Sequence, residues 1–193
     1  MSDNANKKET ILTYVSDVHA LVEHGLRAIE RQRENLKDVS HKAVPPALAE
    51  ALRVLHRQKL EIESRLETLG GKATGPVKDA VSAVAGVAAG IINAVRPSES
   101  VKSLRDDATY FSGLGVAYLL LYTTAVGFDD SETAKLAERG YRDAAKTIMH
   151  LDHVLPAVTV EELREHNPSV RNSAEQVRTM VSQAWDRSQS LSA

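Results

Sequence analysis

The chain has no cysteine, few aromatic side chains and no excess of either charge. Without cysteine it can form no disulfide, use no thiol in catalysis and offer no thiolate to a metal. Its 193 residues include 24 Lys and Arg against 26 Asp and Glu, so the charge balance does not favour nucleic acid or a membrane as partner. The polar opening segment also lacks the apolar run of a secretory signal. We therefore expect a cytoplasmic protein.

The alternating Val, Ile and Thr runs that are typical of strands are missing too. Apolar residues instead recur every three or four positions, as in amphipathic helices. Prolines and glycines separate these stretches because they end helices. We expect one helical domain over residues 1–193. Its predicted core helices span about 8–43, 47–69, 99–126 and 131–155, with a crossover helix at 76–96 and a C-terminal helix at 168–188.

Two boundaries in the C-terminal third depend on particular residues. Pro156 is expected to close the helix 131–155, and Thr159 with Glu162 has the spacing of a capping box that opens a short helix. Asn167 and Pro168 are expected to start the last helix. Two helical hairpins joined by a long connection are typical of a four-helix bundle with a crossover, as in ferritin-like folds.

Two stretches carry no charge, residues 80–95 and 108–128. The second is long enough to span a bilayer, but Asp106–Asp107 and Asp129–Asp130 flank it and no basic cluster sets an orientation. We favour a buried helix of a bundle over a membrane span. In the first stretch small residues recur every fourth position and predict a close helix–helix or subunit contact: Ser82, Gly86, Gly90 and Ala94.

Several short strings occur in an order that resembles a known family. Leu-Gly-Gly-Lys at 69–72 ends a helix, a small-residue helix with AVAGVAAG at 83–90 follows, and a long helix ends in Gly-Phe-Asp-Asp at 127–130. In this layout the chain resembles the YciE/YciF-like bacterial ferritin-like proteins, a stress-associated family of four-helix bundles. The resemblance covers about residues 48–156 and implies an all-α, ferritin-like four-helix bundle with a helical crossover, here with an extra C-terminal helix.

The resemblance also implies a di-metal carboxylate site, which this sequence lacks in part. The family's His-Tyr-Glu string falls on residues 110–112, so the expected glutamate ligand is Ser112. No Asp, Glu or His occurs between Asp107 and Asp129. We therefore expect a bundle that has lost its metal site, with an apolar interior that places Ser112, Tyr118 and Tyr122 where a carboxylate cage would stand.

Other candidate sites each have a simpler structural interpretation. His19 and Glu23, with Glu30 and Glu34 further along, could bind a metal, but a solvated helix face with i,i+4 pairs is favoured. His150 and His153 could clamp a transition metal, or complement a helix C-terminus.

Trp185 is the lone tryptophan of the last helix. It is expected to dock that helix onto the bundle, with an interface anchor as the alternative.

These observations favour a non-catalytic bundle with no metal, no cofactor and a structural or protein-interaction role. We expect a homo-oligomer, with a dimer favoured, and neither nucleic acid nor membrane as partner. The first alternative is a di-iron or manganese oxidase or iron-handling protein that uses Glu30, Glu61 and Asp143. The second is a membrane-associated protein that inserts 80–95 and 108–128 as a hairpin.

Overall fold

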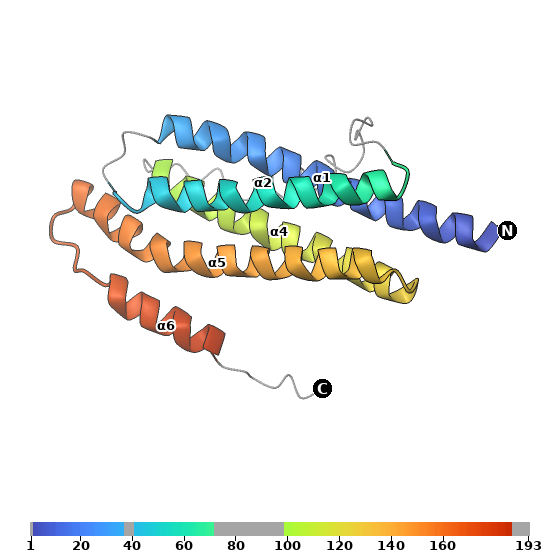
Figure 1. Cartoon of the computed structure of the whole chain (residues 1–193). Coiled ribbons are helices and arrows are strands. Elements are labelled where there is room, and N and C mark those ends of the chain that lie inside the picture. The colour runs from blue at the N-terminus through green and yellow to red at the C-terminus, as the bar shows by residue number, and fades with distance from the viewer. Residues whose placement is uncertain (1, 37–40, 72–98, 187–193) are drawn as a thin grey trace.

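A computed structural model describes residues 2–36, 41–71 and 99–186 of the chain. Within these ranges there are five helices and no strand (Figure 1). The predicted crossover helix at 76–96, and with it Ser82, Gly86, Gly90 and Ala94, lies outside the described residues. The helices are α1 (Ser2–Asn35), α2 (Val44–Thr68), α4 (Glu99–Gly127), α5 (Ser131–His166) and α6 (Ala174–Asp186).

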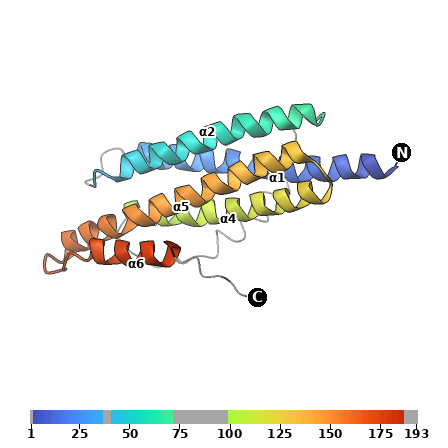
Figure 2. The same ribbon diagram turned by 60° about the horizontal axis from the view of Figure 1, so that its bottom comes forward.

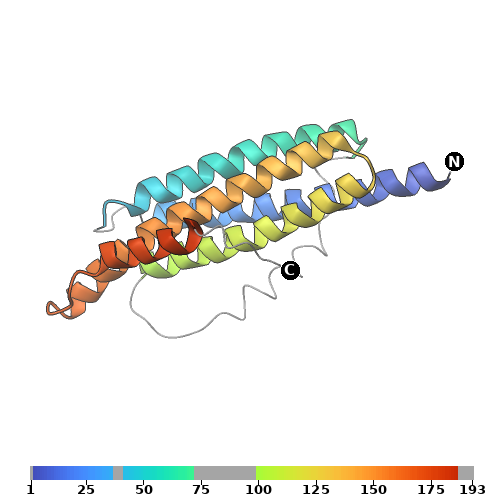
Figure 3. The same ribbon diagram turned by 90° about the horizontal axis from the view of Figure 1, so that it is seen from below.

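The first four of these helices form a bundle of two antiparallel hairpins. α1 pairs with α2 and α4 pairs with α5, while α1 also packs on α4 and α2 on α5 (Figures 1 and 2). Residues 72–98 separate the two hairpins in the sequence, and α6 lies along the outside of α5 (Figure 3). The predicted all-α, ferritin-like bundle with an additional C-terminal helix is confirmed.

The core is built from the predicted apolar stripes. On α1 the residues spaced by three and four are buried, and α2 presents a matching row of leucines. Side chains at this spacing share one helix face, so their burial excludes water along the length of the bundle core. The largest members that are almost completely buried are Val15, Ile29, Leu48, Leu55, Ile62, Leu66, Leu104, Phe111, Leu114, Tyr118, Leu121 and Leu151.

Two tyrosines of α4 lie directly over glycines of neighbouring helices. An added Cβ on Gly140 of α5 would come within 2.2 Å of the Tyr118 ring. Gly25 of α1 lies under Tyr110 in the same way, and the Tyr110 hydroxyl donates to the Leu21 carbonyl oxygen at 3.0 Å. Only glycine leaves room for these rings at the closely packed interfaces that α4 makes with α1 and α5.

The hairpins end in defined turns. Gly70 follows α2 with a left-handed φ of 77°, and the Gly71 N–H bonds to the Leu66 carbonyl oxygen, as expected for a glycine C-cap. After α4, Asp130 caps α5 by accepting hydrogen bonds from the N–H and hydroxyl of Thr133. Arg65 of α2 donates to both Asp130 and Thr133 and so ties the two hairpins together at this end.

The predicted first helix, 8–43, is wrong at both ends, because α1 begins at Ser2 and ends at Asn35. Pro45 and Pro46 open α2 instead of closing α1. A proline in the first helical turn loses no hydrogen bond, so α2 begins at Val44 rather than at 47. The other ends of the predicted core helices 47–69 and 99–126 agree with the structure to within one residue.

The predicted stop at Pro156 is also wrong, since α5 continues through it to His166. A proline inside a helix costs about 3 kcal/mol. Val158 and Val160 beyond it are buried and together offset that cost, because each buried valine stabilises by roughly 1.5 kcal/mol or more. The predicted capping box does not form. Glu162 instead accepts a hydrogen bond from the Val101 N–H, in the first turn of α4.

The last helix begins later than predicted, at Ala174 rather than at 168. Asn167 accepts hydrogen bonds from the N–H and hydroxyl of Ser169 and so forms a turn instead of a helix start. The N–H of Ala174 bonds to the Asn172 side chain. An asparagine close before the helix therefore takes the capping role that the sequence reading gave to Asn167.

One face of α4 is apolar yet exposed. The segment Ser100–Gly127 is long and apolar enough to cross a membrane, and only 33% of its most apolar window is buried in the bundle. Phe111, Leu114 and Tyr118 are buried in the core, which accounts for their apolar side chains. Val116 and Leu119 are each at least half exposed. The expectation of a buried helix over 108–128 therefore holds for one face of α4 and is wrong for the other.

The tyrosine–glycine contact predicts the outcome of a glycine scan. Gly140→Ala forces a Cβ into the buried Tyr118 ring and should lower the free energy of unfolding by about 1–3 kcal/mol, measured by urea denaturation. Gly115→Ala is the matched control. Its Cβ would meet Ala144 at an ordinary 3.8 Å, so we expect it to stabilise by up to ~1 kcal/mol. Equal effects of the two substitutions would contradict this account of the packing.

Candidate functional site

The interior of the bundle is the first place to look for chemistry, because di-metal carboxylate sites lie between facing helices. Among the described residues, Asp107 is the one carboxylate that is buried. Phe111 and Tyr118 are buried further along the same helix, α4. Gln58 is buried as well, and its amide donates to the Gly140 carbonyl oxygen at 3.4 Å.

Ser112, Tyr118 and Tyr122 were expected in the interior, in place of a carboxylate cage, and the structure places one of the three there. Tyr118 is 1% exposed and lies in the core. Ser112 is on the outer face of α4 and donates to the Ala108 carbonyl oxygen, while Tyr122 is 38% exposed. The buried stripe of α4 runs through Phe111, Leu114 and Tyr118, so Ser112 and Tyr122 point away from it.

The seam between α2 and α5 brings together two of the three carboxylates proposed for an oxidase. Arg57 bonds to Asp143 at 2.6 Å and lies 4.0 Å from Glu61, and Arg139 bonds to Glu61 at 3.3 Å. Glu30 is apart from them, beside His56. Guanidinium groups thus occupy the positions that a metal would need, and Glu30, Glu61 and Asp143 do not form a common site.

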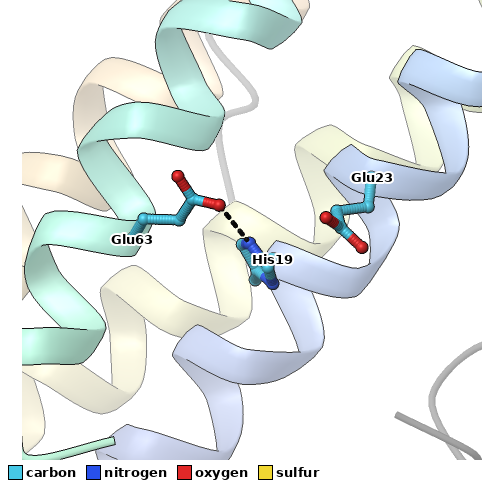
Figure 4. A group of neighbouring side chains, drawn as sticks. All are labelled: His19, Glu23 and Glu63. Atoms are coloured by element: carbon cyan, nitrogen blue, oxygen red, sulfur yellow. Dashed lines mark hydrogen bonds and ion pairs between the residues drawn. The ribbon is translucent and has the colours of Figure 1, made fainter. Parts of the chain in front are cut away.

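The seam between α1 and α2 holds the group best suited to bind a metal. His19 is buried, and its Nε2 lies 3.3 Å from a carboxylate oxygen of Glu63 (Figure 4). Glu23 lies one turn along α1, and the three side chains offer ligand atoms within 4.8 Å of one another. An imidazole and two carboxylates make a plausible partial site for zinc or another divalent transition metal.

A lysine occupies the centre of this group. Lys59 Nζ lies 2.9 Å from Glu23 and 3.6 Å from Glu63, so its ammonium already bridges the two carboxylates. A hydrogen bond from Lys59 lowers the pKa of Glu23, and the bond to Glu23 raises the pKa of Lys59. We call His19, Glu23, Lys59 and Glu63 the α1–α2 cluster. Arg27 lies 2.7 Å from Glu23 as a second cation, so the two carboxylates of the cluster are balanced from within the chain.

The sequence indicated two of the four residues of this cluster, His19 and Glu23, but placed them on the wrong kind of surface. His19 and Glu23 were expected on a solvated face, whereas His19 is 3% exposed. The spacing of Lys59 and Glu63 on α2 is the same i,i+4 spacing as that of His19 and Glu23 on α1. That repeat was the available signal, but only the packing of α1 on α2 shows that the two pairs meet.

Asp107 is a buried carboxyl group whose hydrogen-bonding capacity is only partly satisfied. One of its oxygens has no hydrogen-bond partner, and neither does the buried side-chain oxygen of Gln32. Burial raises the pKa of Asp107 to about 7, with a hydrogen bond from Gln32 opposing the shift and nearby Asp106 adding to it. A single carboxyl of this kind can hold a proton near neutral pH, but it does not make a metal site.

The remaining candidates are on the surface. His150 and His153 are both exposed on α5, and the His153 carbonyl oxygen accepts a hydrogen bond from Arg178 of α6. That bond and the buried Ala174 attach α6 to the bundle. Trp185 is 49% exposed, so it is available to a partner, and its role as an interface anchor stays a prediction.

Comparison with known proteins identifies the fold. No family model and no curated protein sequence matches the chain. Among solved structures, the chain is similar to the bacterioferritin of Desulfovibrio desulfuricans, which was determined with its diiron site in different catalytic states. The two chains are 13% identical, with a TM-score of 0.67 over 92% of this chain and 91% of that one. The chain is therefore a ferritin-like helical bundle. The narrower YciE/YciF resemblance stays a prediction.

The α1–α2 cluster predicts that Lys59 excludes metal ions. Lys59→Met removes the ammonium that bridges Glu23 and Glu63, so that His19 and the two carboxylates can bind a divalent ion, with Arg27 still bonded to Glu23 at 2.7 Å. We expect Zn²⁺ or Co²⁺ affinity, measured by calorimetry, to rise at least about tenfold over the unsubstituted protein. The control His19→Gln/Lys59→Met should lose this gain. Equal affinity with and without Lys59 would show that the lysine does not block the site.

The pKa of Asp107 predicts how stability depends on pH. The folded protein keeps this proton up to about pH 7, whereas the unfolded chain releases it near 3.8. Its contribution to stability therefore falls as the pH rises from about 4 to about 7, and then levels off. Asp107→Asn should stabilise the protein by about 2–4 kcal/mol at pH 8 and by little at pH 4.5, measured by urea unfolding. Glu67→Gln, at an exposed position of α2, is the control. A gain from Asp107→Asn that is equal at both pH values would refute the account.

Proposed function

We propose that this protein is a non-catalytic ferritin-like bundle without a di-metal centre, with a structural or protein-interaction role in the cytoplasm. The observation that carries the proposal is the interior of the bundle, where Asp107 is the single buried carboxylate among the described residues. A di-metal carboxylate site draws a carboxylate from each of the four facing helices. The resemblance to a stress-associated family adds an expected context for this role.

The carboxylates outside the core support the same proposal. Asp143 and Glu61 are paired with arginines, Asp130 is held by Arg65, and Glu23 and Glu63 share Lys59. Each of these five acids already has a cation from the protein itself. Displacing these cations would leave an arginine or lysine half-buried beside a metal ion of like charge, which is unfavourable.

The second candidate is a metal-dependent role, favoured by one observation. His19, Glu23 and Glu63 have the ligand types and the mutual distances of a mononuclear site. Such a site would lie between α1 and α2 alone (Figure 4), so it would bind one ion rather than the pair that a diiron protein holds. It requires Lys59 to move away from both glutamates.

Elemental analysis of the purified protein distinguishes the two candidates. The chain is produced in medium with added iron, manganese and zinc, purified without chelator, and measured by plasma mass spectrometry beside the His19→Gln variant. We expect less than about 0.1 metal ion per chain in both. One ion per chain that is lost in His19→Gln would establish the second candidate. Two ions per chain, or oxygen-dependent oxidation of ferrous iron, would overturn the proposal of a bundle without a metal centre.

A further inference from the structure

The exposed face of α4 is apolar over about four helical turns. From residue 108 to residue 128 the helix carries no charge, and none of the described helices covers its outer side. Leu119, Leu120, Val116 and Val126 are each at least half exposed. A contiguous apolar surface of this length is costly to leave in water, and it marks an interaction site. We define the α4 face as Ser112, Gly113, Val116, Leu119, Leu120, Thr123, Val126 and Gly127.

The spacing of the α4 face is the same when read in either direction. Its midpoint lies between Leu119 and Leu120, and the positions on the two sides mirror one another. A second copy of α4 packed antiparallel about that midpoint would bring Leu119 against Leu120, Val116 against Thr123, Gly113 against Val126, and Ser112 against Gly127. An interface of this kind uses one patch on both subunits and closes with two-fold symmetry.

The shape of the α4 face fits this pairing. Residues 112, 116, 119, 123 and 126 alternate steps of four and three, the spacing at which helices interlock side chains along a coiled-coil seam. The bulky leucines are at the centre and small residues lie toward both ends. A Cβ built on Gly113 or Gly127 meets no atom within 4 Å, so each position has room for a side chain of a second copy.

The charges at the two ends of the helix are complementary in the same arrangement. Arg105, which bonds to the neighbouring Asp106 at 2.7 Å, lies seven residues before Ser112 and so continues the face at its N-terminal end. The exposed Asp129 follows the C-terminal end of the face. Antiparallel packing brings Arg105 of each copy toward Asp129 of the other and opposes the two helix dipoles. Beside Asp129, Tyr122 and Val126 line a groove that also contains Glu138 and Lys135. Lys135 is paired with Glu132 at 2.9 Å, so the carboxylates of the groove suit an arginine with an apolar stem.

A bilayer and another segment of the same chain are the alternative occupants of the α4 face, and the experiments below distinguish them from a second copy. A bilayer would have to pull Phe111 and Tyr118 out of the core before α4 could span it, and the near-neutral chain supplies no basic rim for binding at a membrane surface. The apolar segment 80–95 of the same chain, which Asp79 and Arg96 flank in the sequence, could cover the face instead, and a monomeric protein is the result expected in that case.

We propose that this protein forms a two-fold homodimer in which the α4 faces of two copies pack antiparallel. The inference names a second copy of this chain as the partner in the interaction role proposed above. It rests on the proposed function only because it assumes that role. Metal content and molar mass are measured on the same sample, so either proposal can fail without the other. A dimer that holds metal would refute only the proposed function, and a monomer without metal would refute only this inference.

The first experiment measures the molar mass of the full chain, purified without detergent, by sedimentation velocity from about 1 to 100 µM. We expect a species of twice the 21.0 kDa chain mass. Leu119→Glu/Leu120→Glu places four like charges at the two-fold axis and should raise the dissociation constant at least 100-fold, with unchanged helicity because both side chains are exposed. Leu60→Glu is the matched control, since Leu60 is 68% exposed on α2, and it should stay dimeric.

The second experiment uses the absence of cysteine. In Val116→Cys/Thr123→Cys the two thiols of opposite copies would face each other, so mild oxidation should give a covalent dimer. Val116→Cys alone should not crosslink, because the equivalent residues of the two copies would lie about 10 Å apart along the helix axis.

Four results would overturn the proposal. The first is a monomer over the whole concentration range, as expected if segment 80–95 covers the face, and the second is a dimer that survives the glutamate substitutions. The third is crosslinking that is equally efficient in the single-cysteine variant. The fourth is a protein that is recovered only with detergent or that binds neutral phosphatidylcholine vesicles through α4.

Discussion

The bundle depends on the contact of two tyrosine rings with two glycines. Tyr110 and Tyr118 lie two helical turns apart on α4, and each packs onto the bare backbone of a neighbouring helix, at Gly25 and at Gly140. These contacts fix the position of α4 against both α1 and α5. The same rings lie where a carboxylate cage would need room, so the packing of the fold supports the proposal of a bundle without a di-metal centre.

Amphipathic spacing alone predicted the helices and their pairing, because a buried stripe repeats every three or four residues wherever a helix packs on a core. The ends of the helices were harder to predict where a local signal competed with packing. Pro156 normally stops a helix, but the burial of Val158 and Val160 carries α5 through it. Pro45 and Pro46 were read as the end of one helix when they begin the next. Such choices are decided by tertiary contacts that no short window of sequence contains.

The candidate sites show the same limit more sharply. The lack of acids on the central part of α4 was visible in the sequence, and it supports the proposal of an apolar interior. The α1–α2 cluster was not visible, because His19 and Lys59 lie forty residues apart and meet only through the register of the two helices. A period of 3.6 residues shows which positions share a face. It does not show which face of another helix lies opposite, so contacts between distant segments need the structure.

The hydrogen bond from the Val101 N–H to Glu162 has a consequence for how the chain folds. The side chain that accepts from this N–H, in the first turn of α4, comes sixty-one residues later in the chain. The start of α4 therefore becomes complete only after the far end of α5 has extended past Pro156 and docked. Contacts of such high sequence separation form late, because much chain entropy is lost before they close. The helical hairpin of α4 and α5 would thus zip from its Asp130 turn toward its open end.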